Sequence, residues 1–406
     1  MKAIKSRKSR IYPTKEQVDA FMVDINCKRF VWNELLFARN NQWEVKKAGG
    51  TPNHFKSSQT LTAMKQLPEF SFLKEANSCV LQKSYLDLDQ AYSNFFKSKS
   101  GKRKGPAVGQ PRYKSKKATI QSATYQLLGE RNSYRDIDLN VGFKLPKKIG
   151  WINVDLQVIK DADKSHYPKS VTVSVNKLGQ WFLSFSYTIE TKQPTNINSM
   201  VGIDFGIKTF ATFSDGVLDN GFKPDPTVIA KLKKLQQKLS RQKRGSNGYK
   251  RTRKAFAKLH LKIANQRKDY NHKFTRKVVN ENDLIAIETL SISNWSLSTY
   301  MNRKARELAI SEVMRQLEYK CLHEGKIFIK VSKWLPSSQI CQCCGKKTKH
   351  KLDERVFTCS HCGYTADRDV NAAQNILDEG LKQYASMGNG IDLNVVEANT
   401  GKAGRC

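Results

Sequence analysis

The chain has 406 residues, of which 39% are hydrophobic and 10% aromatic, a composition typical of a globular protein of roughly two to four domains. Its 71 Lys and Arg residues outnumber 36 Asp and Glu residues, and the formal net charge of +35 indicates a polyanionic partner. No stretch reaches the roughly 18 apolar residues of a membrane span, and no apolar segment follows the basic N-terminus. We therefore expect neither a membrane protein nor a secreted one.

The first half of the chain is predicted to combine a helical segment with a small antiparallel barrel. Residues 3–12 alternate as a strand does, and Pro13 ends them. Helical periodicity follows over residues 14–96, and a basic loop punctuated by glycine and proline comes next. Residues 119–190 return to a period of two and contain a hairpin turn, Asn-Lys-Leu-Gly-Gln. We expect the N-terminal strand to complete this barrel.

The second half is predicted to alternate strands and helices. After a polar linker at 192–199, the expected order is two strands from residue 201, two long helices over 226–280, a buried strand over 284–288, a helix over 304–323, a strand over 326–331, a cysteine-rich insert and a last helix starting near residue 365. Residues 382–406 lack periodicity and are expected to form a flexible tail.

The two long helices carry charge of almost one sign. Between residues 231 and 277 there are 18 Lys or Arg residues and a single acid, Asp269. Solvated helix faces normally interleave both signs and gain pairs between residues four apart. These helices are therefore predicted to lie against nucleic acid.

Two Cys-x-x-Cys pairs, separated by fourteen residues and each followed by glycine, predict a structural zinc site. Four thiolates fill the tetrahedral vertices that Zn²⁺ prefers and leave no open position for catalysis. The predicted ligands are Cys341, Cys344, Cys359 and Cys362. Cys343 could compete with a neighbour, although its spacing to Cys341 suits one tetrahedral ion less well. We treat His350 and His361 as bystanders.

Three acids stand out in this basic chain: Asp204 within the strand VGIDFG, Glu288 at the end of LIAIE, and Asp369 at the start of the helix DRDVNAA. Each alone would most often be a helix cap, a turn residue or half of an ion pair, and Asp367 in particular fits a cap of the last helix. Together they match the ribonuclease H-like layout, in which strand and helix acids hold two Mg²⁺ ions. Such ions clamp the attacking water and the leaving oxygen of a phosphodiester.

The chain also resembles the TnpB family, transposon-encoded nucleases similar to compact type V CRISPR effectors. The segments that carry the resemblance are RIYPTKEQ, CKRFVWNELL, LDQAYSNFF, VGIDFGIKTFA, LIAIETLSI, QLEYK, PSSQICQCCG and DRDVNAAQNI. The resemblance implies that Asp204, Glu288 and Asp369 are catalytic; Asp369 is preferred over Asp367 because the family's acid directly precedes V-N-A-A. It also implies that the four predicted cysteines form the family's zinc ribbon, from whose pattern Cys343 departs.

The resemblance further implies the domain organisation of a mixed α/β protein. A RuvC-like, ribonuclease H-like nuclease domain is expected over 198–336 and 364–381, with the zinc ribbon inserted at 337–363. An N-terminal antiparallel β-barrel, the wedge domain, is expected over 1–13 and 118–197, interrupted by a helical recognition lobe at 14–117.

By the same resemblance the protein is expected to be an RNA-guided DNA endonuclease encoded by a transposable element. A guide RNA would pair with one strand of double-stranded target DNA beside a short transposon-associated motif, and two-metal hydrolysis of the strands so separated would leave a 5′-phosphate and a 3′-hydroxyl. We expect it in the cytoplasm of a prokaryote, associated with the nucleoid and with no membrane partner. The oligomeric state is left open.

Nucleic-acid contacts are expected from exposed polar and basic residues. Gln82 could form paired hydrogen bonds to adenine, with an ordinary surface glutamine as the equal alternative. The basic candidates are Lys102, Arg103, Lys104, Arg112, Lys243, Arg244, Lys250, Arg251 and Arg253.

Other functions remain as alternatives. A transposase, or an accessory factor of transposition, would join DNA strands instead of only hydrolysing them. A non-cleaving RNA-guided repressor should have lost at least one acid, whereas all three are present. A single-strand transposase with a His-x-His metal site is excluded, because none of the seven histidines is two residues from another.

Overall fold

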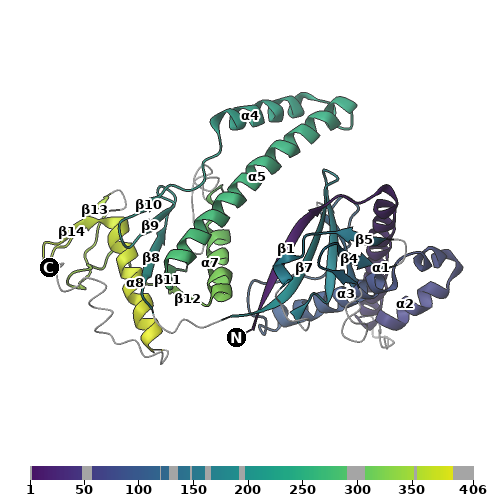
Figure 1. The fold of residues 1–406 in the computed structure, drawn as a ribbon, viewed down its shortest axis with the longest axis horizontal. Helices are drawn as coiled ribbons and strands as arrows, with labels where there is room; N and C mark the ends of the chain where they lie inside the picture. Colours follow the sequence, from purple (N-terminus) through teal and green to yellow (C-terminus); the bar gives the residue numbers. More distant parts are fainter. Residues whose placement is uncertain are drawn as a thin grey trace. The chain divides into compact units, whose positions relative to one another are not determined.

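The protein is described from a computed structural model that places residues 2–47, 57–118, 120–127, 136–146, 149–160, 166–191, 197–289, 307–351 and 354–386 (Figure 1). The chain divides into two compact units: an N-terminal unit, Lys2–Ile189, and a C-terminal unit from Glu190 onward. None of the helices in these ranges combines the length and the apolar character needed to span a bilayer.

Three α-helices and a 3-10 segment form the helical part of the N-terminal unit. They are α1 (Lys15–Lys47), α2 (Ser57–Gln66), η1 (Pro68–Lys74) and α3 (Ser78–Lys99). One face of α3 is buried, and Leu81 and Leu88 are fully covered in a cluster shared with α1 and α2. Asn77 caps α3 by accepting a hydrogen bond from the amide of Cys79.

The strands of the N-terminal unit form two sheets around one core. The four-stranded sheet has the order β1 (Lys2–Ile11), β7 (Trp181–Glu190), β6 (Ser170–Asn176) and β2 (Ile120–Gln126); the three-stranded sheet has the order β3 (Ile137–Asp138), β4 (Gly142–Leu145) and β5 (Gly150–Asn153), with a short 3-10 turn, η3 (Gln157–Ile159), after it. Phe143 of the smaller sheet and Tyr125 of the larger one are buried in the same cluster as Phe21 of α1.

The predicted hairpin is confirmed, because β6 pairs antiparallel with β7. The N-terminal strand β1 takes the edge position beside β7. Closure of the two sheets into a barrel stays a prediction.

A five-stranded sheet with helices on both faces organises the C-terminal unit. Its order is β10 (Leu218–Asp219), β9 (Ala211–Phe213), β8 (Met200–Phe205), β11 (Leu284–Glu288) and β12 (Ile327–Val331). The last three run parallel, and the middle strand of these three is the one predicted over 284–288; β9 and β10 are antiparallel additions. Odd-numbered residues of β8 and β11 face α5 (Asn247–Glu281) and α7 (Ile310–Glu324), and the opposite face packs on α8 (Arg368–Ser386).

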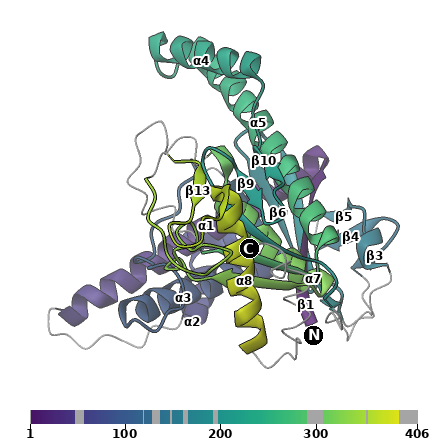
Figure 2. The ribbon, with the colours of Figure 1, turned by 90° about the vertical axis from the view of Figure 1, so that its left-hand side faces the viewer.

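The two predicted basic helices form a hairpin that extends from this sheet (Figures 1 and 2). α4 (Pro226–Arg241) has no buried residue, and its half-buried leucines lie along α5. The first part of α5 is mostly exposed, whereas Phe274, Val278 and Val279 near its end enter the core of the sheet. The hairpin thus presents its cationic side chains on an arm anchored at one end.

Two helices differ from the sequence prediction, and some predicted segments lie outside the described residues. The helix predicted over 304–323 is interrupted at Ala309, whose left-handed φ of 53° separates helical residues 307–308 from α7, which begins at Ile310; residues 304–306 are not described. α8 continues five residues past 381 to Ser386, because Tyr384 packs against the apolar cluster under the sheet, so the predicted tail starts too early. The rest of that tail, and residues 192–196 of the linker, are also outside the described residues.

Candidate active site

Two acidic side chains lie at the ends of adjacent parallel strands. β8 and β11 pair with Ile203 opposite Ile287, so Asp204 and Glu288 follow at neighbouring positions. Residues alternate between the two faces of a strand, and Gly202, two positions before Asp204, contacts α8. Asp204 and Glu288 are therefore on the sheet face that α8 covers.

α8 carries the third acid toward the same face. The helix lies so close to β8 that a Cβ on Gly202 would be 2.1 Å from the carbonyl oxygen of Ala373. Asp367 caps the start of α8, since its Oδ1 accepts hydrogen bonds from the amides of Asp369 and Val370 at 2.9 and 3.1 Å. The predicted cap is confirmed, and Asp369 occupies the first helical turn.

The charges of Glu288 and Asp369 act on Asp204. Burial, followed by the negative charges of Asp369 and Glu288, raises the pKa of Asp204 to about 7, and Arg368 opposes this shift. Burial also raises the pKa of Glu288, although a hydrogen bond from Ser337 partly offsets it. A cation relieves such repulsion, and carboxylate oxygens are the ligands that Mg²⁺ prefers. The donor set fits a divalent cation.

Two arginines join the acids from the side of the zinc ribbon. Nη1 of Arg355 lies 3.0 Å from Oδ2 of Asp369. Arg368 donates a hydrogen bond to the main-chain oxygen of Lys351. Nothing in the sequence singled these arginines out, because they are two among 71 basic residues. Guanidinium groups bind phosphate well, so their position beside the acids suits a phosphodiester substrate.

The four predicted zinc ligands converge. The Sγ atoms of Cys341 and Cys362 are 3.7 Å apart, and those of Cys344 and Cys359 are 3.6 Å apart. Tetrahedral ligands about 2.3 Å from Zn²⁺ would be separated by about 3.8 Å, so this cluster fits the ion. Among the residues that the structure places, these cysteines are the only group of three or more candidate ligands gathered in this way, within 4.8 Å of one another.

The glycines after each cysteine pair form turns, and two further candidate ligands lie outside the cysteine cluster. Gly345 and Gly363, after each cysteine pair, have left-handed φ values of 70° and 74°, which glycine adopts without strain. Cys343 and His350 are outside the group of four; Cys343 packs on the buried core of the ribbon, and the His350 ring lies against Phe357. The ribbon strands are β13 (Val356–Thr358) and β14 (Thr365–Asp367).

Amide side chains of α8 hold the first zinc knuckle. Asn371 accepts a hydrogen bond from the amide of Gln342 and donates one to the carbonyl of Ile340. Asn375 donates to the carbonyls of Ser337 and Ile340 at 2.8 and 2.7 Å. Both asparagines are buried, and they stand within the DRDVNAAQNI segment without having been assigned a role from sequence. Their contacts connect the zinc centre to the helix that bears an acid.

The predicted nucleic-acid contacts fall into two groups, one in each unit. Gln82 lies on the exposed face of α3, and the basic loop after α3 carries exposed Lys102 and Lys104, half-buried Arg103 and exposed Arg112. In the C-terminal unit all five candidates are exposed around the tip of the α4–α5 hairpin: Lys243, Arg244, Lys250, Arg251 and Arg253. Their exposure permits phosphate contact, and their roles stay predictions.

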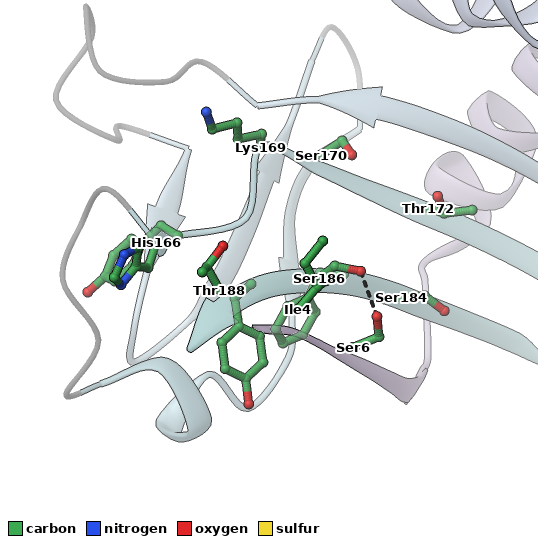
Figure 3. Close-up of a pocket in the computed structure, with 12 residues that line it drawn as sticks. Ile4, Ser6, His166, Lys169, Ser170, Thr172, Ser184, Ser186 and Thr188 are labelled. Carbon is green, nitrogen blue, oxygen red and sulfur yellow. Dashed lines mark hydrogen bonds between the residues drawn. The ribbon is translucent and has the colours of Figure 1, made fainter. Parts of the chain in front are cut away.

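A polar cleft of about 400 Å³ opens on the four-stranded sheet of the N-terminal unit (Figure 3). Six serine and threonine side chains line it: Ser6, Ser170, Thr172, Ser184, Ser186 and Thr188. Ser6 and Ser186 are hydrogen-bonded at 2.7 Å, and Lys169 and His166 stand at the rim. Hydroxyl groups donate and accept hydrogen bonds, so the cleft suits a polar ligand. The alternation of Ser and Thr along β6 and β7 was the sequence signal for it.

Comparison with known proteins places these features in a family. Family models described as "Probable transposase" (of the OrfB type of IS605), "Cas12f1-like, TNB domain" and "Helix-turn-helix domain" match residues 184–299, 311–376 and 1–48. A Streptomyces pristinaespiralis protein named "Putative RNA-guided DNA endonuclease" is 32% identical, over 98% of this chain and 94% of that protein. "Putative RNA-guided DNA endonuclease InsQ" of Escherichia coli K12 is 31% identical, over 94% and 93%.

More distant relatives include CRISPR nucleases. Cas12f1 of Sulfoacidibacillus thermotolerans is 23% identical over half of each chain. A Cas12f1–sgRNA–target DNA complex aligns with a TM-score of 0.49 and 15% identity, over 92% of this chain and 98% of that chain. Because identity above 30% extends over nearly the whole of this chain and of its bacterial relatives, the chain belongs to the TnpB family.

Proposed function

We propose that the protein is an RNA-guided DNA endonuclease that hydrolyses phosphodiester bonds with Mg²⁺ held by Asp204, Glu288 and Asp369. The observation that supports the proposal is the position of Asp204 and Glu288 on neighbouring parallel strands, where the charges of Glu288 and Asp369 both raise the pKa of Asp204. In a chain of charge +35, a buried acid repelled by two other acids is unexpected unless it serves a cation.

Each acid is fixed by its own local structure. Asp204 is held by the pairing of β8 with β9 and β11, and Glu288 by the pairing of β11 with β12 and by the Ser337 hydroxyl. Asp369 is held by the capped start of α8. Two Mg²⁺ ions, when bound, would stabilise charge on the attacking and leaving oxygens of the phosphodiester. Arg355 and Arg368 would orient the phosphate of the strand.

A guide RNA and target DNA are the proposed partners. Relatives named as RNA-guided endonucleases extend over nearly the whole chain, and the positive charge is sufficient to bind both backbones. Contacts would come from the exposed tip of the α4–α5 hairpin, from the basic loop after α3 and from the hydroxyl-lined cleft. Base pairing to the guide would then select the target, next to a short duplex motif that the protein reads, and we place the reaction in a prokaryotic cytoplasm.

The test is cleavage by the protein purified with its own RNA. Asp204→Ala should abolish cutting of a matched duplex while guide-directed DNA binding stays within a few-fold, because the change removes one cation ligand and no phosphate contact. Asp269→Ala is the matched control, since it removes an exposed acid that is ion-paired with Lys273 on α5. Undiminished cleavage by Asp204→Ala would refute the assignment.

A strand-joining transposase is the second candidate, favoured by the family description "Probable transposase" that matches residues 184–299. Substrates labelled at both ends separate the two functions. Hydrolysis yields only shortened strands with a 5′-phosphate and a 3′-hydroxyl, whereas transfer yields joined products longer than either substrate.

A further inference from the structure

An exposed tryptophan stands on the loop that follows β12. Trp334 is 81% exposed, although the indole is among the largest apolar side chains. The contact recorded for its ring is with Nζ of Lys333, 4.6 Å from the ring centroid. The next residue, Leu335, turns inward and packs on the apolar cluster of the sheet. Trp334 therefore contributes nothing to the core, and its ring is accessible to a binding partner.

The loop is attached to Glu288 on both sides of the tryptophan. Val331, three residues before Trp334, is the strand partner of Glu288, and its carbonyl accepts a hydrogen bond from Thr289 at 2.9 Å. Ser337, three residues after, is buried and donates to Oε2 of Glu288 at 3.4 Å. Three residues of chain span at most about 11 Å. The backbone of Trp334 is thus kept within about 11 Å of two residues, Val331 and Ser337, that contact Glu288.

The loop itself has a defined conformation. The amide of Leu335 donates to the carbonyl of Ser332 at 3.1 Å, and the amide of Trp334 donates to the Ser332 hydroxyl at 3.3 Å. These turns present Trp334 and Lys333 together, both exposed. An aromatic ring beside a lysine supplies two contacts that a nucleotide accepts, stacking on its base and attraction to its phosphate.

We propose that Trp334 stacks on a base of single-stranded DNA next to the phosphate that is cut, with Lys333 contacting an adjacent phosphate. The proposal rests on the proposed function and adds a base-binding position to its site. A ring can stack on a base only when the base is free of its neighbour, so the contact selects an unpaired strand over a duplex. Charge complementarity with the cationic chain favours a nucleic acid over an apolar protein segment as the occupant.

The experiment measures binding separately from cutting. The full chain carrying its co-purified RNA and the Asp204→Ala change is titrated with a fluorescent single-stranded oligonucleotide that does not match the guide. Trp334→Ala should weaken this binding by about 5- to 100-fold, the range found when stacking aromatics are truncated. Trp334→Phe should retain most of the affinity, and binding of a duplex of the same sequence should stay unchanged.

A matched control is Leu322→Ala, which removes a 50% exposed apolar side chain from α7 and should have no effect. In the enzyme with Asp204 intact, Trp334→Ala should raise KM for a single strand more than it lowers kcat. Equal affinity of Trp334→Ala and its parent, no measurable oligonucleotide binding by the parent, or equal weakening of duplex binding would each overturn the proposal. Because affinity needs no cleavage, a chain with Asp204 intact that binds the strand but fails to cut a matched target would refute the nuclease function and leave the stacking site standing.

Discussion

Gly202→Ala should separate α8 from the sheet and so test whether this contact places Asp369. The added Cβ would lie 2.1 Å from the carbonyl oxygen of Ala373 and 2.8 Å from both the amide nitrogen and the Cβ of Leu377. Ordinary contacts are about 3.5 Å, so the helix backbone must retreat by roughly 1 Å. Overpacking of this kind costs about 1–3 kcal/mol of unfolding free energy. A 1 Å misplacement of a reacting group lowers the rate by about 100-fold.

Two measurements on one preparation decide the matter. Denaturant unfolding gives the loss of stability, and single-turnover cleavage of a matched duplex gives the loss of rate. Gly109→Ala is the control, because a Cβ there meets nothing within 4 Å and the backbone has no left-handed φ. If Gly202→Ala destabilises the fold but cleaves at the parental rate, the α8–β8 contact does not set the position of Asp369, and the reasoning fails.

Two further predictions concern pH and zinc. Since the raised pKa of Asp204 is about 7, a proton competes with the cation below that pH, so the Mg²⁺ concentration for half-maximal cleavage should rise as pH falls from 8 to 6. Without Mg²⁺, the stability that protonated Asp204 contributes should be lost as pH rises from about 4 to about 7. Asp204→Asn should remove this pH dependence of the unfolding free energy, measured by denaturant unfolding. Cys359→Ser should lower the zinc content of the purified protein and reduce cleavage at least tenfold. Cys79→Ser in the N-terminal unit is the control and should leave both unchanged. Full cleavage activity without zinc would contradict a structural link between the ribbon and Asp369.

Elements with a strong period were predictable from the chain alone. The β6–β7 hairpin, the helices α4 and α5 and the strand β11 follow the predicted segments, because alternation and helical spacing record which face each element buries. The interruption before α7 was not predictable, since the left-handed residue there is Ala309 and not a glycine. The end of α8 was missed because its last turn has one apolar residue in the core, Tyr384, and a single residue does not show helical spacing in the sequence.

The sequence revealed the candidate ligands of the site but not the residues that hold them in place. Acids on apolar strands and paired cysteines are rare enough in a basic chain to attract attention, which is why Asp204 and the zinc ligands were named. Arg355 and Asn371 belong to common types, and their roles arise from hydrogen bonds between segments distant in sequence. Such partners become visible only when the fold brings the segments together.

α8 couples the zinc centre to the acids because its residues serve two opposite faces. Three side chains of α8 at steps of four and three contact the zinc knuckle: Asn371, Asn375 and Asp378. Gln342 alone donates hydrogen bonds to two of them, from its amide to Asn371 and from its side chain to Asp378. Ala373, Leu377 and Gly380, at the same steps but two residues on, face the sheet, where a Cβ on Gly380 would meet Ala286 at 2.6 Å. Two residues of α-helix turn the side chain by about 200°. Asp369 stands four residues before Ala373 on the same stripe of the helix, and its carboxylate is ion-paired with Arg355 of the ribbon. We therefore expect a shift of the ribbon to reach Asp369 through α8.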